Sequence, residues 1–291
     1  MVIDSIPGLK NVRLKDIPNF SVSVYDFPMR EAELAFNASG IIFITYEAFE
    51  QDVFDALKSM FPNIYPIGPL QMLLNTACPD QHLKSMNFTL WEEQSDCLKW
   101  LDTKQPNSVV YISFGSVVNM TSKQMLEFAW GIFNSNYKFL WILRTDFVKD
   151  EPTVLPPEFL EKTKERGLIA TWCPQEQVLK HPAVGGFITH FGANSILESI
   201  YAEVPMIGWP YYGDHQMNCR FSCKTWGIGL EIENDIRRED VESLVRELME
   251  GEKRKELEKQ VVKWKTLAVE ATSAGGSSFV YLEKLVSVLL G

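Results

Sequence analysis

The chain has 291 residues, of which 46% are hydrophobic and 23% charged, and this composition is that of an ordinary globular protein of about two domains. Its net charge of −10 at pH 7 argues against a nucleic-acid backbone or an anionic membrane as a partner. One bound nucleotide remains compatible with this charge, because the N-terminus of a helix can hold a phosphate without surplus basic side chains.

The cysteines and the apolar runs exclude two further classes. Five cysteines occur, at positions 78, 97, 173, 219 and 223, and their spacing matches no metal site. An odd number of thiols without a signal peptide predicts reduced cysteines and a cytoplasmic protein. No apolar run reaches about 18 residues, so we expect no membrane span.

The first 108 residues predict two helix–strand pairs followed by a linker. Residues 1–27 read as irregular, because prolines and glycines punctuate them. Helices are expected at 29–37 and 48–60 and strands at 40–45 and 64–67. Residues 71–108 read as a polar linker that contains one helix, at 90–101.

From residue 109 onward, strands and helices alternate at a spacing that predicts a parallel sheet covered on both faces. The expected strands are 109–114, 139–143, 168–171, 186–189, 206–208 and 229–232. The expected helices are 123–134, 157–163, 194–201, 216–225, 238–250, 253–271 and 277–290.

The chemistry is concentrated between positions 172 and 216. A buried strand there ends in His190, a tight turn holds Gly192, and a helix begins near Asn194 and Ser195. Free N–H groups and the positive end of the helix dipole suit a phosphate at this point. Carboxylates follow at Glu198 and Asp214, and these could accept hydrogen bonds from sugar hydroxyls.

At these residues the sequence resembles the donor-binding signature of the plant family-one UDP-glycosyltransferases, and its phrasing is closest to the cyanohydrin and iridoid glucosyltransferase subgroup. The signature is W-x-P-Q, H-x-x-x-G-x-F-x-T-H-x-G-x-N-S-x-x-E, V-P-M and a final acidic–amide pair. The matching positions are Trp172, Pro174, Gln175, His181, Gly185, Phe187, Thr189, His190, Gly192, Asn194, Ser195, Glu198, Val204, Pro205, Met206 and Asp214.

The resemblance implies a GT-B fold, in which two Rossmann-like domains face each other. It implies that residues 1–70 are a remnant of the N-terminal acceptor domain and residues 109–271 the donor-binding domain, with residues 272–291 as a helix returning to the N-terminal part. The family's catalytic histidine and its aspartate belong to an N-terminal part that this truncated sequence is expected to lack. No catalytic residue is therefore carried over.

The resemblance also implies the roles of the donor-binding residues. The tryptophan stacks on uracil, the glutamine and Glu198 hold the ribose, and the histidine, asparagine and serine hold the diphosphate together with Ser116. Asp214 and His215 hold the sugar. The donor-binding set is Ser116, Trp172, Cys173, Gln175, His190, Gly192, Ala193, Asn194, Ser195, Glu198, Asp214 and His215.

Each residue also has a structural reading. Trp172 and His190 could be ordinary core residues, Glu198 a solvated helix carboxylate, and the strand-Gly-Ser turn before Ser116 a common feature. The sequence also departs from the family: Phe191 stands where cysteine is usual, Ala193 where tryptophan is usual, and His215 where glutamine is usual. The last change suggests weaker selection of UDP-glucose over UDP-galactose.

The leading interpretation is a metal-independent, inverting UDP-glycosyltransferase. It transfers a hexose, by default glucose, to a hydroxyl of a small plant metabolite, and we expect a monomer with no cofactor beyond the donor. The alternative is a catalytically inactive UDP-sugar-binding fragment or regulator.

Overall fold

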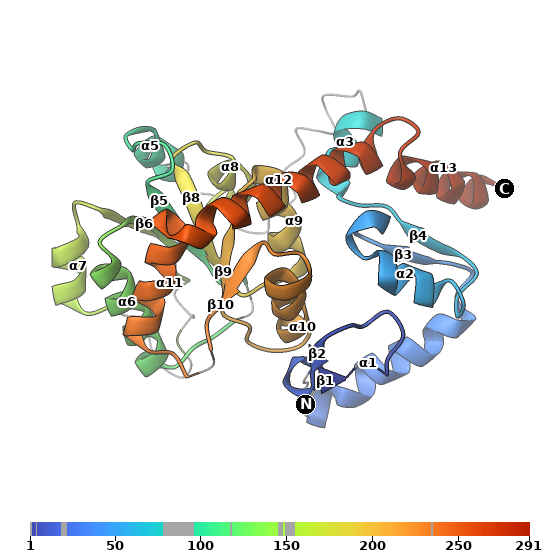
Figure 1. Cartoon of the computed structure of the whole chain (residues 1–291), viewed down its shortest axis with the longest axis horizontal. Coiled ribbons are helices and arrows are strands. Elements are labelled where there is room, and N and C mark those ends of the chain that lie inside the picture. Colours follow the sequence, from blue (N-terminus) through green and yellow to red (C-terminus); the bar gives the residue numbers. More distant parts are fainter. Residues whose placement is uncertain are drawn as a thin grey trace. The chain divides into compact units, whose positions relative to one another are not determined.

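The computed structural model describes residues 2–3, 5–18, 22–77, 96–116, 118–144, 148, 155–233 and 235–291. The chain divides into two compact units (Figure 1). Unit 1 comprises residues 1–88 and 263–291, and unit 2 comprises residues 89–262. Each unit contains its own sheet.

Unit 2 contains a six-stranded sheet in the order β10-β9-β8-β5-β6-β7, and every pair of neighbours is parallel. Every residue of its central strands β5 and β8 is buried, and most of these residues are apolar, as expected where helices cover both faces. The strands are β5 (Val109–Ser113), β6 (Lys138–Ile142), β7 (Gly167–Ala170), β8 (Val184–Thr189), β9 (Met206–Gly208) and β10 (Gly229–Glu231).

The helices of unit 2 lie against this sheet. Helix α6 packs against α11, and their apolar faces join β5, β6 and β8 in one large core that includes Phe128, Trp141 and Phe159. Helix α8 packs against α9 and β8 (Figure 1). The helices are α5 (Asp96–Asp102), α6 (Ser122–Ser135), α7 (Pro157–Thr163), α8 (Gln175–Leu179), α9 (Ala193–Ala202), α10 (His215–Arg220) and α11 (Arg238–Glu250), with a π-helical turn at Phe221–Thr225 after α10.

Unit 1 contains only short strands. Strands β3 (Ile41–Phe43) and β4 (Ile64–Pro66) form a two-stranded parallel sheet, and β1 (Val2–Ile3) pairs antiparallel with β2 (Val12–Arg13). The helices are α1 (Val22–Leu34), α2 (Gln51–Leu57), α3 (Leu70–Ala77) and α13 (Ser277–Leu290), and three 3-10 turns lie at Leu14–Asp16, Ala35–Asn37 and Glu47–Phe49. Helix α12 (Glu252–Thr272) spans the boundary at residue 262.

Two expectations for unit 1 were wrong. Residues 1–27 are not irregular, because β1, β2 and the first part of α1 lie there, and Pro28 is inside α1 instead of preceding it. A proline in a helix interior removes one backbone hydrogen bond and its ring clashes with the carbonyl four residues earlier, so the sequence alone favours a break at this position. The expected linker also contains α3, whose Met72 and Leu73 are buried.

The helix expected at 90–101 lies partly outside the described residues. Its described part is α5, which begins at Asp96. The elements expected from residue 109 onward all occur, with bounds that differ by at most two residues for most of them. The strong alternation of apolar runs and amphipathic stretches explains this accuracy.

Candidate functional site

The expected site residues gather at one edge of the sheet of unit 2. Strands β5, β8 and β9 are parallel, so their carboxyl ends meet there, and Ser116, His190 and Asp214 follow these three strands. The strand order also reverses between β5 and β8, since β6 and β7 extend to one side and β9 and β10 to the other. Open parallel sheets bind ligands in the crevice at such a reversal.

His190 lies in a space that two glycines keep open. A Cβ added at Gly115 or at Gly192 would collide with the imidazole ring of His190. Gly115 also has a φ of +71°, which glycine adopts at little cost. Arg144 Nη1 donates to the carbonyl oxygen of Gly115 at 2.5 Å, so this buried cation fixes the loop that follows β5.

His190 is neutral over the physiological pH range. Burial, and then the neighbouring His215 and Arg144, lower its pKa to about 3. Its Nδ1 lies 3.3 Å from the Thr189 hydroxyl oxygen. If Thr189 donates this bond, the proton of the ring is on Nε2, which then donates to a ligand without carrying a charge.

Helix α9 begins next to this ring. Gly192 is its N-cap residue and makes no side-chain cap, and Ala193, Asn194 and Ser195 form the first turn. Ala193 and Asn194 are exposed and Ser195 is buried. The first N–H groups of the helix and the Asn194 side chain thus offer donors to an anion at this point.

A chain of hydrogen bonds connects the middle of the sheet with α8 and α9. The Tyr111 hydroxyl donates to Gln175 Oε1 at 3.0 Å, and Gln175 Nε2 donates to Glu198 Oε2 at 2.6 Å. The Tyr111 hydroxyl also lies 3.2 Å from Cys173 Sγ, and Gln175 Nε2 lies 3.4 Å from Ser195 Oγ. Burial raises the pKa of Glu198, while its bond to Gln175 lowers it.

A second polar link connects the loop after β8 with the start of α10. Asn218 Nδ2 donates to the carbonyl oxygen of Phe191 at 3.0 Å and to Asp214 Oδ2 at 2.8 Å. Phe191 has a φ of +60°, and its buried ring fills the space that Gly208 and Gly229 leave free. The phenylalanine at this position is therefore matched by two glycines on neighbouring strands.

His215 is buried beside His190. The two rings meet edge to face with centroids 4.6 Å apart, and burial lowers the pKa of His215 while Asp214 raises it. Asp214 itself is exposed. Trp172, half-buried after β7, and Ser116, exposed after β5, complete the set.

Residues 27–263 match the protein family described as UDP-glucoronosyl and UDP-glucosyl transferase. The chain belongs to this family. It is 51% identical to the 7-deoxyloganetin glucosyltransferase of Catharanthus roseus and 50% identical to the (R)-mandelonitrile beta-glucosyltransferase of Prunus dulcis. Each alignment covers 99% of this chain, and the chain spans about 60% of the length of these relatives.

Solved structures of similar UDP-glycosyltransferases confirm the predicted GT-B fold class. Os79 from O. sativa, in complex with UDP, has a TM-score of 0.85 at 27% identity, covering 97% of this chain and 63% of that one. Phytolacca americana UGT2, complexed with UDP-2fluoro-glucose and pterostilbene, has a TM-score of 0.83 at 29% identity, covering 98% and 63%.

The sequence prediction of this UDP-glycosyltransferase family is confirmed, whereas the individual roles of the site residues stay predictions. Three residues that contribute to the geometry were missed: Tyr111, Arg144 and Asn218. The one available signal was Tyr111, because a tyrosine in the middle of a buried strand must find a partner for its hydroxyl.

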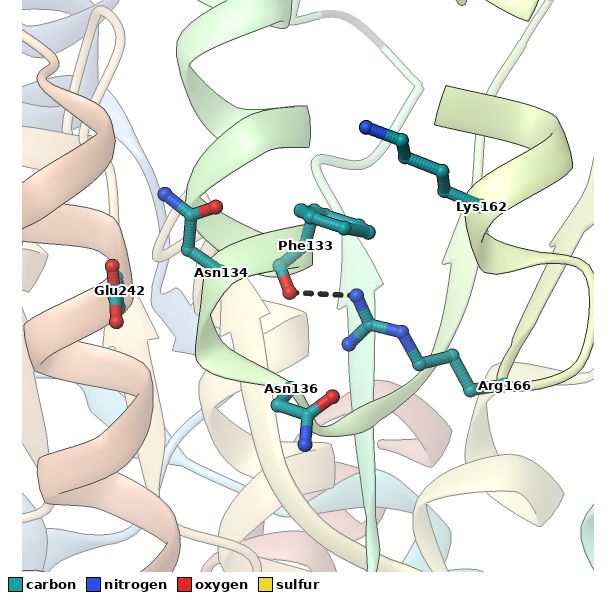
Figure 2. A pocket seen from close by; sticks show the side chains of 6 residues that line it. All are labelled: Phe133, Asn134, Asn136, Lys162, Arg166 and Glu242. Atoms are coloured by element: carbon teal, nitrogen blue, oxygen red, sulfur yellow. Dashed lines mark hydrogen bonds between the residues drawn. The ribbon is translucent and has the colours of Figure 1, made fainter. Parts of the chain in front are cut away.

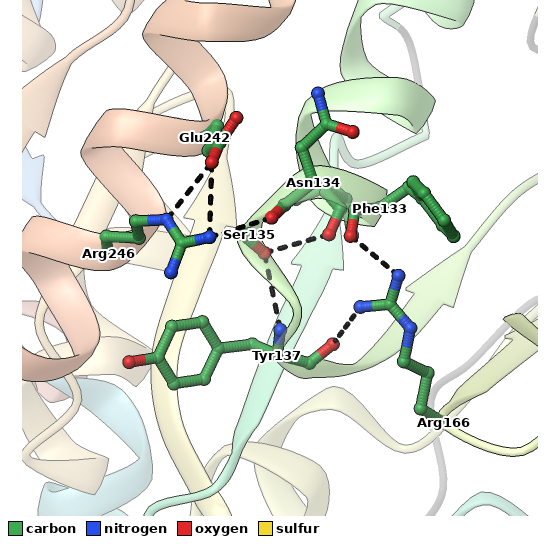
Figure 3. Close-up of polar contacts among 8 residues, drawn as sticks. Phe133, Asn134, Ser135, Tyr137, Arg166, Glu242 and Arg246 are labelled. Atoms are coloured by element: carbon green, nitrogen blue, oxygen red, sulfur yellow. Dashed lines mark hydrogen bonds and ion pairs between the residues drawn. The ribbon is translucent and has the colours of Figure 1, made fainter.

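A pocket of about 590 Å³ lies away from these residues, where β6 and β7 begin (Figure 2). The cations that line it already have partners: Arg166 donates to the Phe133 and Tyr137 carbonyl oxygens (Figure 3), and Lys162 pairs with Glu158 at 2.7 Å. Arg246, just outside the lining, donates to the carbonyl oxygen of Asn134. Basic side chains at the C-terminal end of a helix satisfy its last carbonyls and favour its dipole. We therefore interpret the polar side chains around this pocket as a cap for the C-terminal end of α6, and not as a ligand site.

The described part of the chain lacks two kinds of feature. No group of three or more histidine, cysteine or acidic side chains there is arranged to hold a metal ion. None of the described helices is both long enough and apolar enough to cross a membrane.

Proposed function

We propose that unit 2 binds a UDP-sugar at the carboxyl edge of its sheet, and that the protein transfers a hexose from this donor to a hydroxyl of a small plant metabolite. The observation that supports this most directly is the position of neutral His190, held between Gly115 and Gly192 beside the free N-terminus of α9. The similar structures of Os79, in complex with UDP, and of UGT2, complexed with UDP-2fluoro-glucose, carry ligands of this class.

The arrangement can stabilise a leaving diphosphate. As the anomeric bond breaks, negative charge grows on UDP, and donors already aimed at that position lower the barrier. The proposed donors are His190 Nε2, the first backbone N–H groups of α9, Asn194 and Ser116. Because neutral donors perform this task, the proposal includes no metal ion.

The remaining roles follow the same geometry. Trp172 offers the flat face for uracil, Gln175 and Glu198 meet the ribose, and Asp214 with His215 meets the hexose. We assign glucose as the default donor sugar, inversion at the anomeric carbon, a cytoplasmic location and a monomer. No described residue is assigned as the base that deprotonates the acceptor.

The alternative of an inactive UDP-sugar-binding fragment or regulator has no support from the comparisons, since the similar curated relatives are named as glucosyltransferases. Binding of UDP by unit 2 can be tested separately from sugar transfer.

Calorimetric titration of the purified chain with UDP tests the proposal. Trp172→Ala should weaken binding by roughly 1–3 kcal/mol, the cost of losing one aromatic platform for a base. Trp100→Ala is the matched control, because Trp100 is a half-buried tryptophan of unit 2 on α5 that is outside the proposed donor-binding set. A folded chain that binds no UDP at millimolar concentration contradicts the proposal.

A further inference from the structure

Tyr111 lies in the centre of the sheet and its hydroxyl reaches a site residue. The side chain is fully buried in β5, and its ring stacks on Phe187 of β8 at 5.0 Å between centroids and 18° between planes. The two residues are also register partners in the sheet. A ring held in this way on two central strands offers a rigid support for its hydroxyl.

The hydrogen bonds that connect Cys173, Tyr111, Gln175 and Glu198 have one order of donors and acceptors. An ionised carboxylate accepts only, so Glu198 requires an N–H from Gln175. The amide oxygen of Gln175 then points the other way, to the Tyr111 hydroxyl, which donates to it. The Cys173 thiol completes the sequence by donating to the phenol oxygen.

This order matters because an amide can rotate by half a turn. Gln175 is half-buried at the start of α8, and its own side chain does not fix which end faces Glu198. Glu198 excludes the rotated amide, which would turn its oxygen toward the carboxylate, and the Tyr111 hydroxyl holds the other end of the amide in place by donating to its oxygen. Networks of this kind hold both members more firmly than separate pairs do.

We propose that Tyr111 is a positioning residue that fixes the Gln175 amide and the Glu198 carboxylate in the orientation that recognises the ribose hydroxyls of the donor. The inference rests on the proposed function, because it requires a nucleotide at this site. Tyr111 touches no ligand itself, since it acts through Gln175 from inside the sheet.

The inference predicts a change in selectivity and not only in affinity. A hydrogen bond from a sugar hydroxyl to a charged group should make UDP bind on the order of tenfold to a hundredfold more tightly than 2′-deoxy-UDP. Without the Tyr111 hydroxyl, the Gln175 amide oxygen loses the donor that anchors it, so the side chain leaves this position for part of the time and its bond to Glu198 is then lost. Tyr111→Phe should therefore lower this preference by about fivefold or more, mostly by weakening UDP.

The experiment titrates UDP and 2′-deoxy-UDP, by calorimetry, into the full chain and four variants. Tyr111→Phe removes one buried hydroxyl with little change of volume. Tyr137→Phe is the matched control, because it removes a tyrosine hydroxyl of unit 2 next to the amino end of β6, at the opposite edge of the sheet. Glu198→Gln, alone and combined with Tyr111→Phe, completes a double-mutant cycle.

The outcomes separate the inference from the proposed function. A preference that falls in Tyr111→Phe, persists in Tyr137→Phe and falls no further when Tyr111→Phe is added to Glu198→Gln supports the positioning role. Equal weakening of UDP and 2′-deoxy-UDP, or no change, overturns it and leaves the proposed function intact. Absence of UDP binding by the unsubstituted chain overturns both.

Discussion

The two parallel sheets of this protein differ in how completely they are covered. In unit 2, every residue of β5 and β8 is buried, and aromatic side chains from two helices fill the space beside them. In unit 1, Ile42 in β3 is 49% exposed and Ile44, just after that strand, is 53% exposed. Parallel sheets are normally covered on both faces, so only the sheet of unit 2 meets this requirement among the described residues.

The contrast indicates where precise chemistry can be built. The described core of unit 1 around β4 is small, consisting of Tyr65, Ile67 and Leu73 with partly buried side chains of α13. All residues proposed to bind the donor lie in unit 2, where the strand ends are fixed by a large core. Sites on rigid elements hold their geometry better than sites on loosely packed ones.

The largest expected effect is a difference in local stability. Backbone amides of β3 should exchange with solvent orders of magnitude faster than those of β5 and β8, because regions with few buried contacts open at low free energy. Native-state hydrogen exchange followed by mass spectrometry measures this directly. Equal protection of the two sheets would contradict the comparison.

A matched pair of substitutions tests the same difference energetically. Ile188 in β8 is fully buried, and Ile42 is the central residue of β3. Ile188→Ala should reduce the free energy of unfolding of unit 2 by about 2–5 kcal/mol, whereas Ile42→Ala should cost less than about 1 kcal/mol. Urea unfolding of both variants gives the two values, and similar losses would mean that the exposed face of β3 is covered in solution.

The sequence predicted unit 2 far better than unit 1, and the same difference in burial explains why. Strands such as β8 and β9 are continuous apolar runs bounded by turn residues, so their type and position follow from composition. Helix α1 carries Pro28 in its interior, and α3 lies in a stretch that reads as polar, so tertiary context decides both.

The site could be predicted only as far as spacing in the sequence allows. The turn at Gly192 and the start of α9 follow from the order of strand, glycine and polar residues. The bond from Tyr111 to Gln175 joins residues 64 positions apart, and that from Asn218 to Phe191 joins residues 27 apart. Such contacts depend on strand order, which no local pattern contains.

An effect of intermediate size is the loss of stability of unit 2 at acid pH. The folded pKa of His190 is about 3, well below the value of about 6.5 in an unfolded chain, so the unfolded state binds the extra proton between these values. The stability that His190 contributes is complete above pH 6.5 and falls as the pH decreases toward 3, by about 1.4 kcal/mol per pH unit.

The free energy of unfolding of unit 2, measured between pH 7 and 4.5, shows this loss. His190→Gln should lower the number of protons taken up on unfolding by about one, and the slope of the free energy against pH should fall accordingly. Glu198 has a raised pKa and acts in the opposite direction, but it is present in both proteins and cancels in the difference. Identical pH profiles for the two proteins would show that folding does not lower the pKa of His190.

The smallest expected effect lies wholly within unit 2 and concerns the hexose. His215 is 7% exposed, and among the described residues its Nδ1 has no hydrogen-bond partner, while its ring packs against His190 and Tyr212. A neutral imidazole offers one donor and one acceptor at angles that a glutamine amide does not reproduce. Glucose and galactose differ only in the direction of one hydroxyl, so this exchange should alter their ratio.

We expect His215→Gln to shift the preference toward UDP-glucose by less than about tenfold, the equivalent of a single neutral hydrogen bond. Competition between UDP-glucose and UDP-galactose measures the ratio, and Gln216→Ala, at the next position of α10, is the control that should leave it unchanged. A ratio that is the same before and after His215→Gln would show that His215 supports the fold of the site without selecting the sugar.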